Sequence, residues 1–504
     1  MTDGTALREI AADILTEILE KGQYAHLALF QALSKYQYLE KADRSFLKRI
    51  VDGTVEYKIQ IDYIINAYSK TKVHKMKPFI RTLLRMSVYQ IYYMDRVPDS
   101  AACNEAVRLA KKRGFSGLSG FVNGVLRSVA RGKGKLTFPD DSVRYSMPDW
   151  ILSLWKENYG AETTHRMAQA GLEKRPFMVR FAESRAGKEE ILASLSAQGV
   201  TAEETAAGSG VYRLTGVDYP ESLDAFREGL IRIQDLSSSL AGDAAGIKEG
   251  DFVLDVCGAP GGKGLHAADL LHGTGQVEIR DVSDYKVSLI EENIARSGCT
   301  NVSACAWDAC EFDASMEQKA DVVIADLPCS GLGIIGRKPD IKYNASMDGI
   351  RDLAALQRQM LSVVWQYVKP GGVLVYSTCT VNRLENDENR AWFLNEYPFE
   401  PVDISGRLGI DFQEDSLKEG YIQLYPGVHP CDGFFISVMK KKRDNWTEQC
   451  MNTGKTPRVH IGEREAVRYG KAGYKINDAG GTACLFGESG RKTIPDRPDL
   501  SVDA

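Results

Sequence analysis

The stretch from Phe252 to Gly264, FVLDVCGAPGGKG, decides the fold of the second half of the chain. Its opening run, Phe252 to Val256, is short and largely apolar, which predicts a buried strand, and a glycine-rich loop follows at once. In a doubly wound sheet, the turn from the first strand into the first helix is where a nucleotide-like ligand binds. Glycines allow the backbone to approach such a ligand, and the helix N-terminus favours a carboxylate or a phosphate.

This loop differs from the two best-known nucleotide-binding loops. A phosphate-binding loop reads G-x-x-x-x-G-K-[ST], but Gly258 and Gly262 are one residue too close, and Gly264 replaces the Ser or Thr that would hold Mg²⁺. A dinucleotide-binding loop reads G-x-G-x-x-G, which is absent here. The loop therefore indicates a nucleotide-like ligand of another kind.

Acidic residues stand at the ends of the next two predicted strands. Asp281 follows the strand 277–280, and Asp308 follows the strand 302–305. A carboxylate at the first position can accept hydrogen bonds from ribose hydroxyls, and one at the second can meet the adenine amino group. Two such carboxylates beside the glycine-rich loop favour an adenosyl ligand.

Strands and helices alternate through this part of the chain, which predicts a parallel, doubly wound sheet. The predicted strands span 252–256, 277–280, 302–305, 322–325 and 373–377, with helices at 263–272, 284–297 and 349–368 and a further strand at 433–439. We therefore expect a C-terminal α/β domain with a Rossmann-like sheet over residues 241–443.

Residues 1–136 show apolar residues every three or four positions, which predicts an all-α bundle of six or seven helices. This segment has 23 Lys and Arg against 13 Asp and Glu, a net charge of +10; because the whole chain carries −5, the remainder carries −15. A basic domain on an acidic chain is a hint of RNA binding. Lys111, Lys112 and Arg113 are candidate RNA contacts.

Two other segments complete the predicted multidomain layout. Residues 146–240 combine helices at 148–159 and near 187–198 with strands at 177–181 and 211–214, which predicts a small α+β subdomain that links the domains or binds RNA. Residues 444–504 lack periodicity and are rich in Gly, Asp, Lys and Arg, so we expect a disordered tail there.

Composition excludes several classes of protein. No stretch approaches the ~18 apolar residues that span a bilayer, and the N-terminus lacks the features of a signal peptide. We therefore expect a cytoplasmic protein with no membrane partner, whose ten cysteines are mostly reduced thiols. No second Cys/His pair accompanies Cys305 and Cys310 at zinc spacing, so no metal is expected.

Two cysteines follow the ends of two predicted strands. Cys329 lies in the run DLPCSG and Cys379 in the run STCT, so both thiols should reach the carboxyl edge of the sheet beside the cofactor. A thiol suits the methylation of cytosine, because carbon 5 of that base is a poor nucleophile. A thiolate that adds to carbon 6 converts the ring to an enamine, whose carbon 5 can attack a methyl sulfonium.

This chemistry suggests a role for each nearby side chain. Cys379 is the expected nucleophile, and Lys263 is a candidate cation that would favour its thiolate form. Asp326, at the start of the DLPCSG run, is the candidate proton donor to ring atom N3. Cys329 is the candidate for assisting the release that follows loss of the carbon 5 proton.

Four motifs occur in the order typical of a known family: the runs 255–263, 326–331, 338–342 and 377–380. With them the chain resembles the Nol1/Nop2/Sun RNA cytosine-C5 methyltransferases. Its helical N-terminus is similar to the antitermination factor NusB, especially between 96 and 127. The stretches 420–426 and 432–435 match the C-terminal end of the family, so the resemblance covers about residues 5–440.

The resemblance implies S-adenosylmethionine as the methyl donor, Cys379 as the nucleophile and Cys329 as the residue that assists product release. It also implies a set of cofactor-binding residues: Cys257, Gly258, Ala259, Pro260, Gly261, Gly262, Lys263, Asp281, Asp308 and Asp326. A NusB-like domain joined to this catalytic domain is the layout of bacterial enzymes that methylate 16S ribosomal RNA. The expected substrate is therefore one cytosine of that RNA, free or in an assembling subunit, and the expected state is a monomer.

The chain departs from the family pattern at several positions. Gly258 stands in place of Ala, Gly264 in place of Thr or Ser, and Gly336 in place of Arg, while the run 383–386 reads RLEN in place of PEEN. None of these changes removes a catalytic group. Gly336 and Arg383 could alter RNA contacts, which leaves the target cytosine open. Two alternatives to the expected function also stay open: a methyltransferase acting on another RNA such as transfer RNA, and a ribosome-assembly factor without activity.

Overall fold

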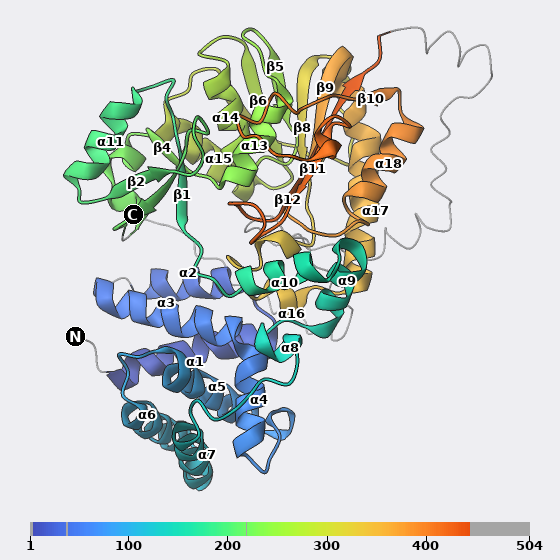
Figure 1. The fold of residues 1–504 in the computed structure, drawn as a ribbon. Coiled ribbons are helices and arrows are strands. Elements are labelled where there is room, and N and C mark those ends of the chain that lie inside the picture. Colours follow the sequence, from blue (N-terminus) through green and yellow to red (C-terminus); the bar gives the residue numbers. More distant parts are fainter. Residues whose placement is uncertain (1–3, 37–38, 218, 444–504) are drawn as a thin grey trace, which may run out of the picture.

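The computed structural model describes residues 4–36, 39–217 and 219–443, so the tail expected over 444–504 lies outside the described residues. A helical N-terminal domain, a small sheet and a large sheet follow one another along the chain (Figure 1). This arrangement confirms the predicted fold class. None of the helices within the described ranges is long and apolar enough to cross a membrane.

The N-terminal domain is the predicted helical bundle. Its helices are α1 (Gly4–Lys21), α2 (Ala25–Lys35), α3 (Lys41–Glu56), α4 (Lys58–Tyr68), α5 (Pro78–Tyr93), α6 (Asp99–Lys112) and α7 (Ser119–Arg131). Helix α5 begins with Pro78, whose fixed φ suits the first helical position. It packs against α1, α3, α4, α6 and α7 and buries Leu83, Leu84 and Val88, so it forms the centre of the bundle.

Three short helices lead from the bundle to the sheets: α8 (Asp141–Arg144), α9 (Asp149–Tyr159) and α10 (Ala161–Ala170). Trp155 of α9 is almost fully buried, and its indole Nε1 donates a hydrogen bond to the carbonyl of Val381, 3.0 Å away. Apolar side chains of α9 and α10 pack with Leu332 and Ile335. These helices therefore support the loops at the edge of the large sheet, below which they lie in Figure 1.

The small sheet has the order β2-β3-β1-β4, and its neighbouring strands are antiparallel. It comprises β1 (Phe177–Phe181), β2 (Thr201–Glu204), β3 (Val211–Thr215) and β4 (Ile231–Ile233), with helices α11 (Lys188–Ala197) and α12 (Asp224–Arg227). The sequence predicted β1, α11 and β3. It did not reveal β2, which is polar and largely exposed, or β4, which has three residues.

The large sheet has the order β10-β12-β9-β8-β5-β6-β7, with β11 paired to β12. Its strands are β5 (Phe252–Asp255), β6 (Gln276–Asp281), β7 (Val302–Ala306), β8 (Ala320–Asp326), β9 (Val368–Thr378), β10 (Phe399–Pro401), β11 (Tyr421–Leu424) and β12 (Phe434–Lys441). The five predicted strands β5–β9 are parallel. The sheet as a whole is mixed, however, because β12 runs antiparallel to β9, β10 and β11.

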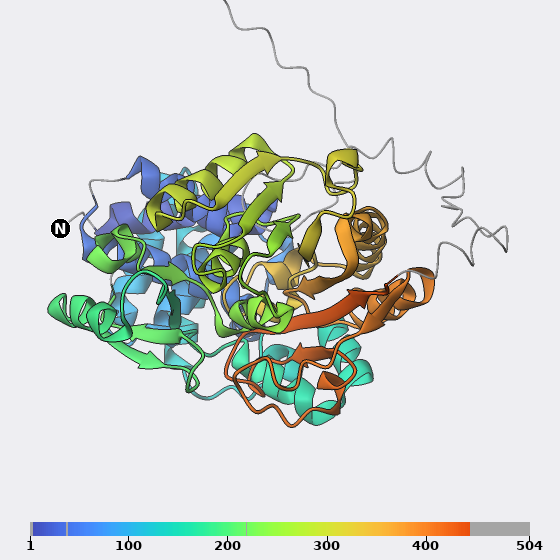
Figure 2. The ribbon, with the colours of Figure 1, turned by 90° about the horizontal axis from the view of Figure 1, so that it is seen from above.

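Helices cover both faces of the large sheet, as a doubly wound fold requires. One face packs against α13 (Leu236–Ala245), α14 (Gly262–Leu270) and α15 (Asp284–Ser297), and the other against α17 (Met347–Val364) and α18 (Asp387–Glu396). Figure 2 shows the small sheet to one side of the large one. Because β5, β6, β8 and β9 are parallel, their carboxyl ends lie together at one edge of the large sheet.

The motif KPDIK over 338–342 joins the large-sheet domain to the helical bundle. Asp340 is buried and accepts a hydrogen bond from the backbone N–H of Ala25, the first residue of α2, at 3.0 Å. Lys342 is 1% exposed and donates to the carbonyl of Glu56 at 2.8 Å. Burial lowers the pKa of Lys342 to about 7, against the opposing charge of Glu56. The motif thus holds the two domains together.

Candidate active site

The candidate site lies where β8 and β9 end side by side. Asp326 and Ser377 are opposite each other in the parallel pairing of these strands, and Ser377 Oγ donates a hydrogen bond to Asp326 Oδ1 at 2.8 Å. Cys379 follows β9 directly, and Cys329 lies three residues beyond the end of β8. The sheet register therefore brings together all three predicted catalytic residues.

The two cysteines touch each other. Their Sγ atoms are 3.3 Å apart, and Cys329 is 1% exposed whereas Cys379 is only partly buried. The hydrogen bond with Cys379 and burial both raise the pKa of Cys329. Cys329 therefore keeps its proton and lies behind Cys379, whose sulfur is the more accessible of the two.

Lys263, at the start of α14, completes the site. Its Nζ lies 2.5 Å from Asp326 Oδ2. Burial works to lower the pKa of Lys263, but the charges of Asp326, Asp255 and Cys379 outweigh it and raise that pKa. The cation suggested from the sequence thus lies within electrostatic reach of the Cys379 sulfur. Asp326 accepts hydrogen bonds at both oxygens, so it is a carboxylate here, and Lys263 carries the proton of the pair.

The glycine-rich loop is held close to the ends of β5 and β6. The backbone N–H of Gly258 donates to the carbonyl of Arg280 at 2.8 Å, and that of Ala259 donates to Asp281 Oδ2 at 3.1 Å. Gly261 has φ of +106°, a conformation that L side chains rarely adopt. Asp281 also pairs with Lys286 at 3.0 Å, so it positions the loop that it borders.

Asp308 and the glycine-rich loop carry groups that suit an adenosyl ligand. Asp308 is partly exposed after β7, and its Oδ1 accepts the backbone N–H of Cys310 at 2.8 Å. A carbon added at Gly262 would meet only Gln234 Nε2, at 4.0 Å, so the backbone is open there. Carboxylate acceptors and an open backbone fit an adenosyl ligand with a carboxylate. No cluster of metal-binding side chains occurs among the described residues.

Ile279 explains two of the departures from the family pattern. A Cβ at Gly264 would come within 2.5 Å of Ile279 Cδ1, and one at Gly258 would come closer still to Ile279 Cγ2. Ile279 is fully buried in β6 and cannot withdraw without leaving a cavity. The two glycines therefore provide the volume that Ile279 fills.

A buried polar network that sequence reasoning missed supports the two cysteine loops. Glu385 is fully buried and accepts the backbone N–H of Ser330 at 2.8 Å, and also hydrogen bonds from Ser330 Oγ, Asn382 and Gln357. Ser330 Oγ lies 2.7 Å from Thr380 Oγ1. Because Ser330 follows Cys329 and Thr380 follows Cys379, the network holds both loops. The sequence signal for this network is the Glu-Asn pair at the end of the run RLEN, which the chain shares with the family pattern PEEN.

Replacing Glu385 with alanine is expected to lower the free energy of unfolding by about 3 kcal/mol, because several buried donors lose their acceptor. Denaturant unfolding followed by circular dichroism measures the change. Glu388→Ala is the matched control, since Glu388 is exposed on α18. Equal midpoints for the two variants would show that the network does not hold the loops.

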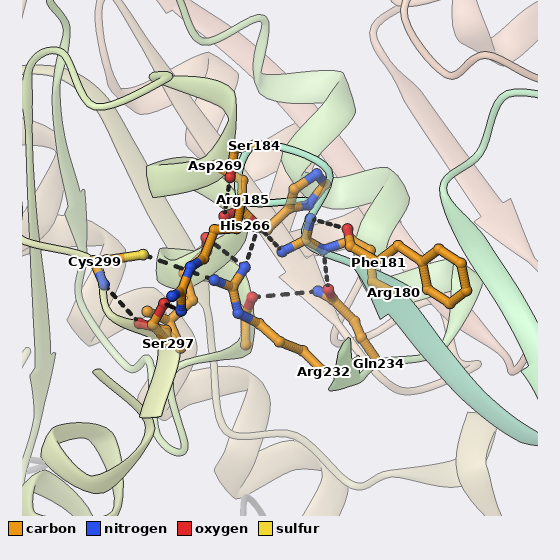
Figure 3. Close-up of polar contacts among 12 residues, drawn as sticks. Arg180, Phe181, Ser184, Arg185, Arg232, Gln234, His266, Asp269, Ser297 and Cys299 are labelled. Carbon is orange, nitrogen blue, oxygen red and sulfur yellow. Dashed lines mark hydrogen bonds and ion pairs between the residues drawn. The ribbon is translucent and has the colours of Figure 1, made fainter. Parts of the chain in front are cut away.

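A second buried cluster ties the small sheet to the C-terminal end of α14 (Figure 3). Arg180 of β1 and Arg232 of β4 both form ion pairs with Asp269 of α14. Burial alone would raise the pKa of Asp269, but the two arginine charges hold it below its ordinary value. Gln234 accepts from Arg180 Nε at 2.9 Å. Because α14 begins at the glycine-rich loop, these contacts fix the small sheet beside the site.

The three candidate RNA contacts at the C-terminal end of α6 differ from one another. Lys112 pairs with Glu9 at 2.6 Å, and Arg113 pairs with both Glu9 and Asp13 of α1. Lys111 is exposed, and no acidic partner for it occurs in the described part of the chain. Two of these three charges therefore stabilise the bundle, and Lys111 is the one left to meet an external anion.

Comparison with known families divides the chain in the same order as the fold. The model of the NusB family matches residues 5–131. The ferredoxin-like domain of RsmF/B-like methyltransferases matches residues 147–217, and the 16S rRNA methyltransferase RsmB/F matches residues 245–440. The helical bundle, the small sheet and the large sheet each correspond to one of these matches.

Similar proteins span the same length. A probable ribosomal RNA small subunit methyltransferase B of Bacillus subtilis is 37% identical over 448 residues, which cover 87% of this chain and 99% of the relative. The ribosomal RNA small subunit methyltransferase B of Cronobacter sakazakii is 29% identical, over 86% of this chain and 99% of its own.

Solved structures share the fold. The protein PH0851 superposes with a TM-score of 0.72 at 24% identity, over 86% of this chain and 99% of that chain. A methyltransferase homologue from Pyrococcus horikoshii has a TM-score of 0.52 at 26% identity, over 60% of this chain and 100% of that chain.

Proposed function

Because the chain belongs to the family of 16S rRNA methyltransferases RsmB/F, we propose that it methylates carbon 5 of one cytosine in small-subunit ribosomal RNA, with Cys379 as the covalent nucleophile. The observation that carries this proposal is the pair of sulfur atoms 3.3 Å apart, with the Lys263–Asp326 ion pair beside them. A methyltransferase that acts on a nucleophilic oxygen or nitrogen atom does not need an accessible thiol backed by a second, buried one.

S-adenosylmethionine fits the edge of the sheet as the methyl donor. The loop 257–263 offers an open backbone, and Asp281 and Asp308 offer acceptors for the ribose hydroxyls and the adenine amino group. When bound there, this group supplies an electrophilic methyl to carbon 5. The residues of this chain activate the cytosine.

In the first step, Cys379 Sγ forms a bond to carbon 6, and the electrons of the carbon 5–carbon 6 double bond shift into the ring. Ring atom N3 takes up a proton as this happens. Lys263 Nζ can pass its proton to Asp326 Oδ2, 2.5 Å away, as Asp326 protonates N3. Asp326 thus acts as the predicted donor with a proton that comes from Lys263.

In the last step, carbon 5 loses its proton and the bond between carbon 6 and Cys379 breaks. Cys329 holds a proton next to the departing sulfur, because hydrogen bonding with Cys379 and burial raise its pKa. It gives that proton to Cys379 and takes the carbon 5 proton in exchange, so both cysteines end as thiols. The proton on N3 returns through Asp326 to Lys263 as the double bond between carbon 5 and carbon 6 re-forms. Release is therefore the step that needs Cys329.

The RNA must present an unpaired or flipped-out cytosine to this edge. We propose that the helical bundle and the small sheet bind the flanking RNA, with Lys111 among the contacts. Both units are fixed relative to the catalytic edge, through the KPDIK motif and the Asp269 cluster respectively.

Incubation of the protein with radiolabelled S-adenosylmethionine and either small-subunit rRNA or transfer RNA tests the proposal. Nucleoside analysis is expected to recover the label as 5-methylcytidine at one position of the rRNA. Label in transfer RNA alone would support the proposed reaction and show that transfer RNA, not rRNA, is the substrate. No transfer to any RNA would contradict the proposed activity and favour an assembly factor.

A further inference from the structure

Arg175, in the segment between α10 and β1, covers Gly336. A Cβ built on Gly336 would lie 2.6 Å from Arg175 Nε and 3.3 Å from its Cζ and Nη2. The φ of Gly336 is not positive, so the backbone itself would accept a side chain. The Arg175 guanidinium thus occupies the space next to Gly336, and a side chain at position 336 would displace it.

Arg175 makes no side-chain hydrogen bond within the described residues. Its side chain is 15% exposed, and its Nε is buried without a hydrogen-bond acceptor among the described residues. Its Nε forms an ion pair with Asp432 Oδ1 at 3.9 Å, a distance too long for a hydrogen bond. One buried N–H without an acceptor is costly in the free protein, and the Nη donors of the same guanidinium are available to an acceptor that arrives with a ligand.

The neighbouring Arg337 differs in this respect. Its Nη2 donates to Asp235 at 2.7 Å, its Nη1 donates to the carbonyl of Pro176 at 3.2 Å, and its Nε pairs with Asp432. Arg337 thus uses its donors to hold three segments together. Of the two arginines in this cluster, Arg175 is the one able to bind something else.

The cluster adjoins the nucleophile. The backbone N–H of Gly333 donates to the carbonyl of Cys379 at 3.1 Å, and the backbone N–H of Gly433 donates to the carbonyl of Gly333 at 2.9 Å. Gly433 follows Asp432 directly, and the loop from Gly333 leads to Gly336. The loops that carry Gly336 and Asp432 are therefore hydrogen-bonded to the loop that carries Cys379.

We propose that Arg175 binds a backbone phosphate of the RNA next to the target cytosine, from the space that a longer side chain at position 336 would otherwise fill. A phosphate offers oxygens to the planar fork of an arginine side chain, which suits charge-assisted hydrogen bonds. Arg175 is thus proposed as an RNA-binding residue that positions the substrate, and its role rests on the proposed function of the site in RNA methylation.

The test compares four proteins: the wild type, Arg175→Ala, Gly336→Arg and the double variant. Binding of small-subunit rRNA is measured without a methyl donor at several salt concentrations, and KM and kcat are measured separately. Arg175→Ala is expected to weaken binding and raise KM about tenfold, with kcat nearly unchanged. Losing one phosphate contact lowers the slope of log affinity against log salt by about 0.7.

Gly336→Arg alone is expected to weaken binding as well, because its Cβ collides with Arg175. The double variant is expected to recover most of the affinity, since an arginine then enters the same space from the other side. Lys174→Ala is the matched control, because Lys174 is the exposed cation next in the chain. Arg175→Lys and a thermal melt of each variant separate loss of charge from loss of folding.

Unchanged affinity and salt slope in a folded Arg175→Ala protein would overturn the inference. So would a double variant that binds no better than Arg175→Ala. If the wild type binds RNA but transfers no methyl group, the proposed function fails, while the binding comparison still decides the role of Arg175.

Discussion

Replacing Cys379 with alanine is expected to lower the rate of methyl transfer by about four orders of magnitude or more, because the covalent addition to carbon 6 is lost. The affinity for S-adenosylmethionine should stay close to that of the wild type. Lys263 keeps its contact with Asp326, and the loop 257–263 keeps its bonds to β6. Single-turnover transfer to small-subunit rRNA measures the rate, and calorimetric titration measures cofactor binding.

Cys299→Ala controls for the loss of a thiol. Cys299 is partly buried and contacts Arg232 at 3.7 Å, outside the candidate active site. This variant is expected to transfer methyl groups at a rate near that of the wild type. A Cys379→Ala protein with a comparable rate would contradict the role of Cys379 as nucleophile.

Replacing Cys329 with alanine is expected to trap the enzyme on its RNA. The first addition and methylation need Cys379, Lys263 and Asp326, which all remain, but the departing sulfur loses the proton donor 3.3 Å away. A covalent protein–RNA adduct should accumulate in stoichiometric amounts, while multiple turnover falls by about two orders of magnitude or more. Denaturing gel electrophoresis with labelled RNA detects the adduct.

The double variant Cys329→Ala/Cys379→Ala is the control for this trap, since it lacks the sulfur that forms the bond. It should give no adduct. An adduct of equal amount in the double variant would place the covalent bond elsewhere. Normal turnover by Cys329→Ala would show that release does not need its proton.

The parts of the fold that the sequence predicted are those in which local pattern and burial coincide. The strands β5, β8 and β9 contain apolar runs, and β6 alternates polar and apolar residues. The parallel register then determines which residues meet at the edge. That is why the meeting of Asp326, Cys329 and Cys379 could be foreseen. Strands such as β2, which is polar, and β4, which is very short, have no such pattern.

The direction of the last strands also could not be predicted from the local sequence pattern. The sequence showed that residues 433–439 form a strand, but not that β12 enters the sheet between β9 and β10 and runs antiparallel to both. Strand direction depends on the path of the connecting chain, here a loop through β11, rather than on the residues of the strand.

Long-range partners account for the other differences. Lys112 and Arg113 look like free cations in sequence, yet their acidic partners Glu9 and Asp13 lie about a hundred residues away in α1. Lys342 looks like part of a catalytic motif, yet it is buried against the helical bundle. The reason for Gly336, a guanidinium supplied by Arg175, is likewise visible only in three dimensions.

The most direct test of the central claim is to incubate the wild-type protein with S-adenosylmethionine and small-subunit rRNA that contains 5-fluorocytidine, and to map the modified peptide by mass spectrometry. Fluorine at carbon 5 cannot leave as a proton does, so the covalent intermediate should persist. If Cys379 is the nucleophile, one methylated fluorocytidine is expected to be attached to the peptide that contains Cys379. Attachment to the peptide that contains Cys329, or methylation without any attachment, would contradict it.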